Sequence, residues 1–227
     1  MNAEARSGRG LGSAYEQRRR EIVDAVVEVA GSGGLEAVNV RDIADRAGVS
    51  LGRVQHYFPS KTDLMAAAFD QVSRAATGRI QQRLADDPAL RNPVATLGLI
   101  VEELIPDGPE RRTELAVAFA FTARALVDPE LAARLRQGYA ELRALVARLL
   151  AEGVAAGLFV LRATPEAEAD RCLALVEGLG VYVLLGHRTA AEARRLALEA
   201  LTPDWLRVHE TPTRHLRGPF GGVSQRR

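Results

Sequence analysis

Side chains that can hydrogen-bond to the edges of nucleic-acid bases lie close together between residues 51 and 61. Arg53 can present two donors to guanine, and Gln55 can pair with adenine through one donor and one acceptor. Lys61 adds a compact positive charge next to Ser60, at the start of a predicted helix whose first N–H groups favour a phosphate. These residue types predict a surface that contacts DNA in the major groove.

Two short helices are predicted to position these side chains, over residues 40–46 and 51–57. Ala44 is small enough for the two helices to cross closely, and Gly48 supplies the positive φ that ends the first of them. Ser50 can cap the second helix. Apolar residues recur at the spacing that buries one face of both helices against an earlier helix: Ile43, Ala47, Val49 and Val54, facing Ile22, Val26 and Val29. The side chains left outside are those of Leu51, Gly52, Arg53, Gln55 and His56.

The stretch 40–64, which ends Tyr57-Phe58-Pro59-Ser60-Lys61-Thr62-Asp63-Leu64, closely resembles the DNA-binding motif of TetR-family transcriptional regulators. The close resemblance covers about residues 14–65, and the remainder is similar to the family in its all-helical architecture. What the resemblance implies is contact with DNA by the exposed residues of the motif, with Tyr57 and Lys61 on phosphates. The expected DNA-binding set is Arg41, Ser50, Leu51, Gly52, Arg53, Gln55, His56, Tyr57 and Lys61.

Some positions leave alternatives open. Many family members carry a tyrosine where this chain has Gln55, so Gln55 could contact a base or a phosphate, and Asn39 stands where threonine is common. A purely structural interpretation is that Val54, Tyr57 and Phe58 only pack a small core, and for Phe58 we prefer it.

The sequence predicts an all-α protein of about nine helices. Four prolines each follow a residue that can cap a helix, at Asn92-Pro93, Gly108-Pro109, Asp128-Pro129 and Thr164-Pro165. Four more helix starts pair a polar cap with a side chain three residues on: Ser13 with Glu16, Asn39 with Asp42, Ser60 with Asp63, and Thr189 with Glu192. The expected spans are 14–31, 40–46, 51–57, 61–85, 93–105, 109–127, 129–156, 165–186 and 190–201.

Four regions are expected along the chain. Residues 1–12 would form a mobile arm, residues 13–60 a three-helix helix-turn-helix DNA-binding domain, residues 61–202 a larger helical effector-binding and dimerisation domain, and residues 203–227 a disordered tail. Small-molecule effectors of this family bind in the second domain. Four residues there could line a mostly apolar pocket: Phe119, Phe121, Arg124 and Tyr139. For the three aromatic residues we prefer the alternative that they simply belong to the core. A buried Arg124 would need an acidic partner or an anionic ligand.

Residues 173–185 are apolar on every side of a helix except at Glu177. One chain can cover only part of such a helix, so a second subunit is expected to cover the rest, unless the helix is buried within one chain. The small residues Ala174, Gly178 and Gly180 would permit close approach in an intersubunit four-helix bundle, which would also include the helix after Thr189. The predicted interface residues are Ala174, Gly178, Val181 and Leu185. Such a homodimer suits a pseudo-palindromic operator in double-stranded DNA.

The main rival class is an enzyme on a helical scaffold. The four histidines are scattered, neither a nucleotide-binding motif nor a His-Glu-x-x-His zinc motif is present, and the single cysteine, Cys172, is expected to be buried and inert. A second rival is a dimeric ligand-binding protein that has lost DNA binding, which Arg53 and Lys61 argue against. We therefore expect no catalytic residues, no cofactor and no metal. No apolar run is long enough for a membrane span, and a cytoplasmic location is expected.

The function predicted from the sequence is sequence-specific DNA binding by a transcriptional regulator. Repression relieved by an unidentified small molecule is the expected output, with activation as the less common alternative in the family.

Overall fold

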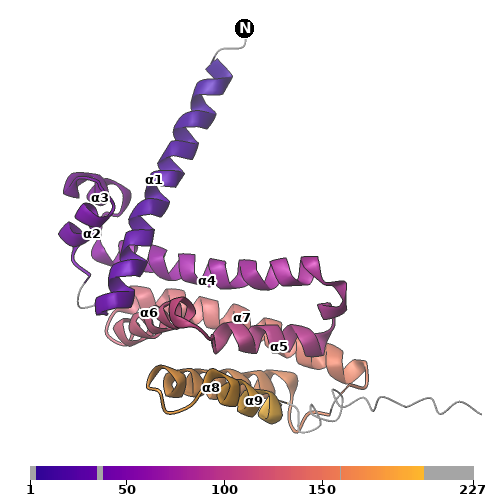
Figure 1. The fold of residues 1–227 in the computed structure, drawn as a ribbon. Coiled ribbons are helices and arrows are strands. Elements are labelled where there is room, and N and C mark those ends of the chain that lie inside the picture. The colour runs from indigo at the N-terminus through magenta and orange to yellow at the C-terminus, as the bar shows by residue number, and fades with distance from the viewer. Residues whose placement is uncertain (1–3, 35–37, 159, 202–227) are drawn as a thin grey trace, which may run out of the picture.

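The computed structural model describes residues 4–34, 38–158 and 160–201, and this part of the chain is helical without any strand. The elements follow the chain as α1 (Glu4–Gly33), α2 (Val40–Arg46), α3 (Leu51–Tyr57), α4 (Lys61–Asp86), the short 3-10 helix η2 (Pro88–Leu90), α5 (Pro93–Leu104), α6 (Pro109–Ala125), α7 (Pro129–Ala155), α8 (Pro165–Leu184) and α9 (Ala190–Leu201). In Figure 1, α2 and α3 lie beside α1 at one end of the molecule, and the long helix α4 runs from them along the larger body. The predicted all-α fold is confirmed.

The helix starts are set by proline and by polar caps. All four prolines predicted at the first helical position are found there, in α5, α6, α7 and α8. The Asn92 side chain accepts a hydrogen bond of 2.9 Å from the N–H of Ala95, whereas Gly108, with φ of 86°, precedes α6 without a side-chain cap. Thr189 and Glu192 bond reciprocally at the start of α9, as predicted from their spacing.

The first helix departs from the expectation. Helix α1 begins at Glu4, so Ser13 lies inside the helix and the predicted start at residue 14 is wrong. Glycine inside a helix costs only about 1 kcal/mol relative to alanine, and no proline interrupts residues 4–13, so the glycines there do not stop the helix. Mobility of residues 1–12 stays a prediction, and the predicted tail, 203–227, lies outside the described residues.

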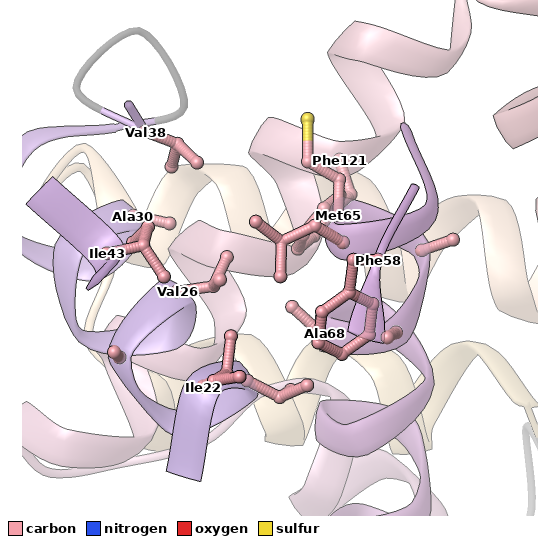
Figure 2. Packing of buried hydrophobic residues seen from close by; sticks show 14 of the residues in the cluster. Ile22, Val26, Ala30, Val38, Ile43, Phe58, Met65, Ala68 and Phe121 are labelled. Carbon is pink, nitrogen blue, oxygen red and sulfur yellow. The ribbon is translucent and has the colours of Figure 1, made fainter. Parts of the chain in front are cut away.

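The amino-terminal core joins α1, α2 and α3 to the start of α4 (Figure 2). Ile22, Ile43 and Val54 are each fully buried in it. Phe121 from α6 enters the same core, and so do the five buried residues of α4 from Leu64 to Ala68. Packing is therefore continuous across the predicted domain boundary at residues 60 and 61.

The second core lies among α5, α7, α8 and α9. Two arginines donate hydrogen bonds to backbone carbonyls at the carboxyl-terminal ends of α8 and α5. Arg112 donates to the oxygen of Val183 at 2.9 Å, and Arg194 donates to that of Ile105 at 2.7 Å. Cys172 is buried in this core, as predicted, and burial raises the pKa of its thiol to about 12.

Candidate nucleic-acid interface and effector cavity

Helix α3 presents the predicted base-contacting residues to solvent. The Ser50 side chain accepts a hydrogen bond of 3.2 Å from the N–H of Arg53, which confirms the predicted cap. Gly48 has φ of 63° and makes the turn before it, as predicted. Val54 faces the core with 0% of its surface exposed, while the side chains of Arg53 and Gln55 are exposed. Gly52 and His56 are exposed as well, and Leu51 is half-buried.

The amino terminus of α4 lies immediately after this surface. Ser60 and Asp63 form the predicted capping box, in which the hydroxyl of Ser60 accepts from the N–H of Asp63 at 3.0 Å. The N–H groups of Lys61 and Thr62 have no acceptor within a helix, because they belong to its first turn. Lys61 is exposed, so its ammonium and these N–H groups can face a phosphate together.

Arg41 is the second residue of α2, close to the amino terminus of that helix. Its backbone N–H donates to the side chain of Asn39 at 3.0 Å, so asparagine caps α2 where threonine is common in the family. The Arg41 side chain is exposed at the start of the helix.

An aromatic cluster of Tyr15, His56 and Tyr57 supports the end of α3. The ring of Tyr57 lies 4.6 Å from that of Tyr15 and 5.6 Å from that of His56, measured between centroids. Sequence reasoning missed Tyr15, although it stands seven residues before Ile22 on the buried face of α1. Phe58 is 4% exposed with the Arg19 guanidinium 5.0 Å from its ring centroid, which confirms the core role that we preferred for it.

A cavity of about 470 Å³ lies in the larger body, between α4, α5, α6, α7 and α8. Its walls are mainly apolar, with a few charged side chains. Of the four residues predicted to bind the ligand, Phe119 and Tyr139 line this cavity.

The other two predicted ligand residues point elsewhere. Phe121 is 2% exposed and packs edge-on against Phe69 in the amino-terminal core, at 5.9 Å between ring centroids. Side chains two positions apart lie on opposite sides of a helix, so Phe119 and Phe121 could not both face one cavity. Arg124 is exposed and pairs with Asp128 at 3.7 Å. Because it is not buried, it does not need an anionic ligand to compensate its charge.

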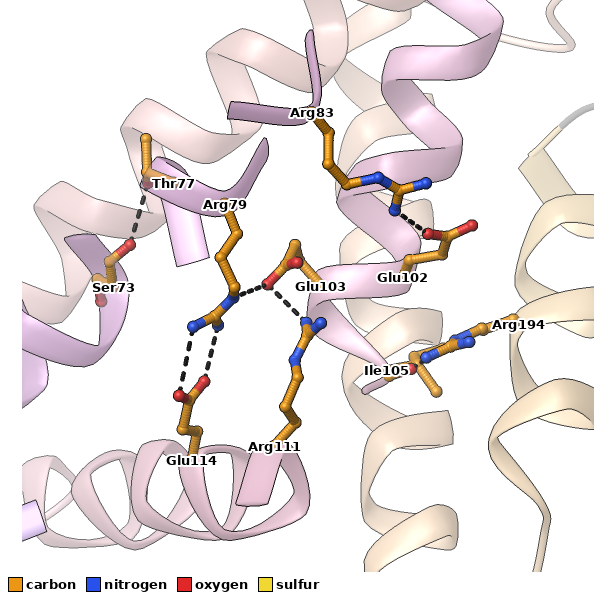
Figure 3. A network of polar contacts seen from close by, with 10 residues as sticks. All are labelled: Ser73, Thr77, Arg79, Arg83, Glu102, Glu103, Ile105, Arg111, Glu114 and Arg194. Atoms are coloured by element: carbon orange, nitrogen blue, oxygen red, sulfur yellow. Dashed lines mark hydrogen bonds and ion pairs between the residues drawn. The ribbon is translucent and has the colours of Figure 1, made fainter. Parts of the chain in front are cut away.

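A network of ion pairs forms one wall of the cavity (Figure 3). The Glu103 carboxylate, with 5% of the side chain exposed, receives Arg79 at 3.0 Å and Arg111 at 2.6 Å. Arg79 also makes two hydrogen bonds to Glu114, of 3.3 and 2.7 Å. The Nε atom of Arg111 is buried and has no hydrogen-bond partner within the described part of the chain. The sequence predicted none of these residues, although Glu103 and its neighbour Glu102 are the two acids of a mainly apolar helix.

Tyr139 and Glu177 meet at another wall of the cavity. Burial, followed by a hydrogen bond to the adjacent Glu177 carboxylate, raises the pKa of Tyr139 to about 12. Tyr139 therefore stays protonated near neutral pH, and Glu177 is the residue that interrupted the apolar stretch at 173–185.

Comparison with known proteins connects both regions to one family. Residues 22–68 match the family described as "Bacterial regulatory proteins, tetR family", and residues 93–203 match "BetI-type transcriptional repressor, C-terminal". The chain is 33% identical over 174 residues to the HTH-type transcriptional regulator PksA of Bacillus subtilis, covering 75% of this chain and 80% of that protein.

The chain belongs to the TetR family of transcriptional regulators. The predicted helix-turn-helix and the predicted function of a DNA-binding transcriptional regulator are therefore confirmed. A further relative, the HTH-type transcriptional repressor KstR of Rhodococcus jostii, is 37% identical over 92 residues, which span 40% of this chain and 41% of the repressor. A solved transcriptional regulator from Rhodococcus sp. RHA1 superposes with a TM-score of 0.64 at 27% identity, over 84% of this chain and 95% of that one.

In this TetR-family chain, the four residues predicted at a dimer interface share one face of α8. Ala174 and Gly178 are exposed, Val181 is half-buried, and Leu185 is 76% exposed. Leu175 and Tyr182 extend the same apolar face. Gly180 points inward instead, where a Cβ atom would lie 3.4 Å from the ring of Phe119, so it cannot permit close approach of a second subunit.

Two further properties concern the described ranges alone. None of their helices is both long and apolar enough to traverse a lipid bilayer. They also hold no group of three histidine, cysteine, aspartate or glutamate side chains placed to bind one metal ion.

Proposed function

We propose that this TetR-family regulator is a homodimeric repressor that binds a pseudo-palindromic operator through α3 and leaves it when a small molecule fills the cavity. Arg53 and Gln55 would contact bases, with the exposed remainder of α3 beside them. Arg41, Tyr57 and Lys61 would contact phosphates and fix the position of α3 in the groove. Ser50 and Leu51 would lie at the entry of α3, near the backbone.

The observation that carries the proposal is the exposed face of α3. A side chain can read a base only if its helix is held firmly while the side chain itself stays free. The Ser50 cap and the buried Val54 hold α3, and Arg53 makes no ion pair within the described residues. Lys61, at the start of α4, offers the neighbouring phosphate contact.

The apolar face of α8 supports the dimer. Leu175, Tyr182 and Leu185 are 36%, 47% and 76% exposed, and a contiguous apolar face of this kind is typical of a protein interface. A second copy of α8 and α9 would cover it and bring two α3 helices to successive half-sites. Sedimentation at micromolar protein concentration should give a dimer, and a monomer there would contradict this part of the proposal.

The cavity supports the effector response. Five helices line it, one of which, α4, begins at the DNA-binding surface, so a molecule inside could change the orientation of α3. We propose no catalytic role and no cofactor for this site. Binding to operator DNA would place the protein in the bacterial cytoplasm.

The direct test is an electrophoretic mobility shift with the DNA upstream of the protein's own gene. Arg53→Ala should relax the preference at one base pair, at a cost of about 1–3 kcal/mol. Lys61→Ala should weaken binding to all DNA sequences alike, and it should reduce the slope of log K against log salt concentration by about 1. Arg148→Ala removes one exposed charge from α7 and serves as the control, with no expected change. Binding by both variants that equals the parent's would contradict the assignment of these contacts.

A further inference from the structure

The charges around the cavity do not balance. Two arginines and four glutamates line it, so it carries a formal excess of two negative charges. Both arginines are already committed, since Arg79 pairs with Glu103 and Glu114, and Arg111 also pairs with Glu103. Within this network the charges cancel. The excess therefore resides on the remaining two carboxylates, those of Glu141 and Glu177.

These two carboxylates differ in their surroundings. Glu141 is exposed, and it accepts a hydrogen bond of 3.0 Å from Gln137 in the next turn of α7. Glu177 is half-buried on α8 and, within the described residues, makes no ion pair. Its neighbour is Tyr139, a neutral donor that compensates none of its charge.

Aromatic and apolar groups surround Glu177 in the cavity wall. The ring of Phe119 packs on Gly180, one turn along α8 from Glu177, and Leu173 and Val176 line the same wall. A partly desolvated carboxylate beside aromatic rings suits a cation whose remaining surface is apolar, because the rings also attract positive charge. An anionic ligand would meet the uncompensated charge of Glu177, whereas the charges of both arginines are already neutralised by Glu103 and Glu114.

We infer that the effector of this regulator is a mainly apolar organic molecule with one cationic centre, which pairs with the Glu177 carboxylate between Tyr139 and Phe119. This inference rests on the proposed function, because it names the chemical class of the molecule that would fill the cavity. Arg111 also lines the cavity, and its unpartnered Nε can donate a hydrogen bond to an uncharged oxygen of the same molecule.

The test compares two probes of equal shape and different charge on the full-length protein. Benzyltrimethylammonium carries a quaternary nitrogen where neopentylbenzene carries a carbon atom, and 3-phenylpropanoate serves as an anion of similar size. Binding of each is measured by calorimetry, in parallel with displacement of labelled operator DNA. We expect the cation to bind and the anion not to bind.

Glu177→Gln should lower the affinity for the cation by about 10-fold or more, because it removes the charged partner of the cation. The affinity for neopentylbenzene should stay unchanged. Glu141→Gln removes the same charge from the exposed rim and should change the affinity for the cation by less than about 3-fold. Retained binding of the neutral probe shows that Glu177→Gln has folded.

Three outcomes would overturn the inference: equal affinity of the parent and Glu177→Gln for the cation, tighter binding of the anion than of the cation, or no binding by any of the probes. Each of them leaves operator binding by the parent unaffected, so the ligand class can fail while the proposed function stands. Loss of operator binding in the parent would be the separate failure of the proposed function.

Discussion

The hydroxyl of Thr62 donates a hydrogen bond of 3.1 Å to the carboxylate of Asp128. Thr62 lies in the first turn of α4, next to Lys61, and Asp128 caps α7 by accepting from the N–H groups of Glu130 and Leu131. One side chain therefore links the start of α4 to α7, the helix that carries Tyr139.

Removal of that hydroxyl should measure the strength of the link. Thr62→Val preserves the shape of the side chain and leaves part-buried Asp128 without one donor, so we expect a loss of about 1 kcal/mol in the free energy of unfolding. Urea denaturation measures it. In the control Thr77→Val, the lost hydroxyl donates only to the Ser73 carbonyl of its own helix, and a change within about 0.5 kcal/mol is expected. Equal losses in both variants would mean that the link contributes nothing.

The same aspartate should contribute to stability in acid. The backbone N–H of Leu131 lowers the pKa of Asp128, and the hydrogen bonds from Thr62 and Glu130 act in the same direction against the effect of burial. A carboxyl group with a lowered pKa in the folded state stabilises the protein above its ordinary pKa of about 3.9, and this contribution is lost as the pH falls through the folded value. Asp128→Asn should therefore be less stable than the parent at pH 6, and the gap should narrow below about pH 4. Urea midpoints across this range check it, and a constant gap would contradict the prediction.

Two neighbouring glutamates on α5 should respond differently to the same change. Glu103 is 5% exposed and shared by Arg79 and Arg111, whereas Glu102 pairs with Arg83 at the surface. Glu103→Gln leaves two arginines without their shared partner. Because these arginines are about one-third exposed, we expect the free energy of unfolding to fall by about 2 kcal/mol, which is less than for a fully buried pair. Glu102→Gln should cost less than about 1 kcal/mol. Thermal unfolding compares them, and a similar loss in both variants would contradict the expected difference.

Two helical glycines should respond in opposite directions to alanine. A Cβ atom on Gly31 would lie 2.2 Å from the Thr113 methyl group, where α1 meets α6, so Thr113 would have to rotate and give up its hydrogen bond to the Pro109 carbonyl. We expect Gly31→Ala to destabilise the protein by about 1 kcal/mol. Gly78→Ala, on α4, meets nothing within 4 Å and should stabilise it by about 0.5–1 kcal/mol. Equal effects on the melting temperature would show that α1 and α6 do not pack closely at Gly31.

Local chemistry made much of the fold predictable from the sequence. A proline at the first helical position and a polar cap before it fix the start of a helix through contacts within a single turn. Helices α5, α7 and α8 therefore begin where predicted. The start of α1 was misjudged because glycine weakens a helix without ending it, and Ser13 is a plausible cap that the structure does not use.

The cavity was harder to predict, because it depends on which faces of five helices meet. Glu177 could be singled out as the one charge in an apolar stretch, yet only the packing of α7 on α8 shows that it faces Tyr139. Phe119 and Phe121 looked equivalent in the sequence, and the direction in which α6 faces its neighbours separates them.

Helix α4 begins at Lys61 and still lines the cavity at Ile80. At a rise of about 1.5 Å per residue, those two residues are roughly 28 Å apart along one continuous rod. The rod acts as a lever, since a tilt of about 5° around its cavity end displaces its other end by roughly 2 Å. That distance is most of a hydrogen-bond length, so a tilt of this size at the cavity is enough to break a contact between Lys61 and a phosphate.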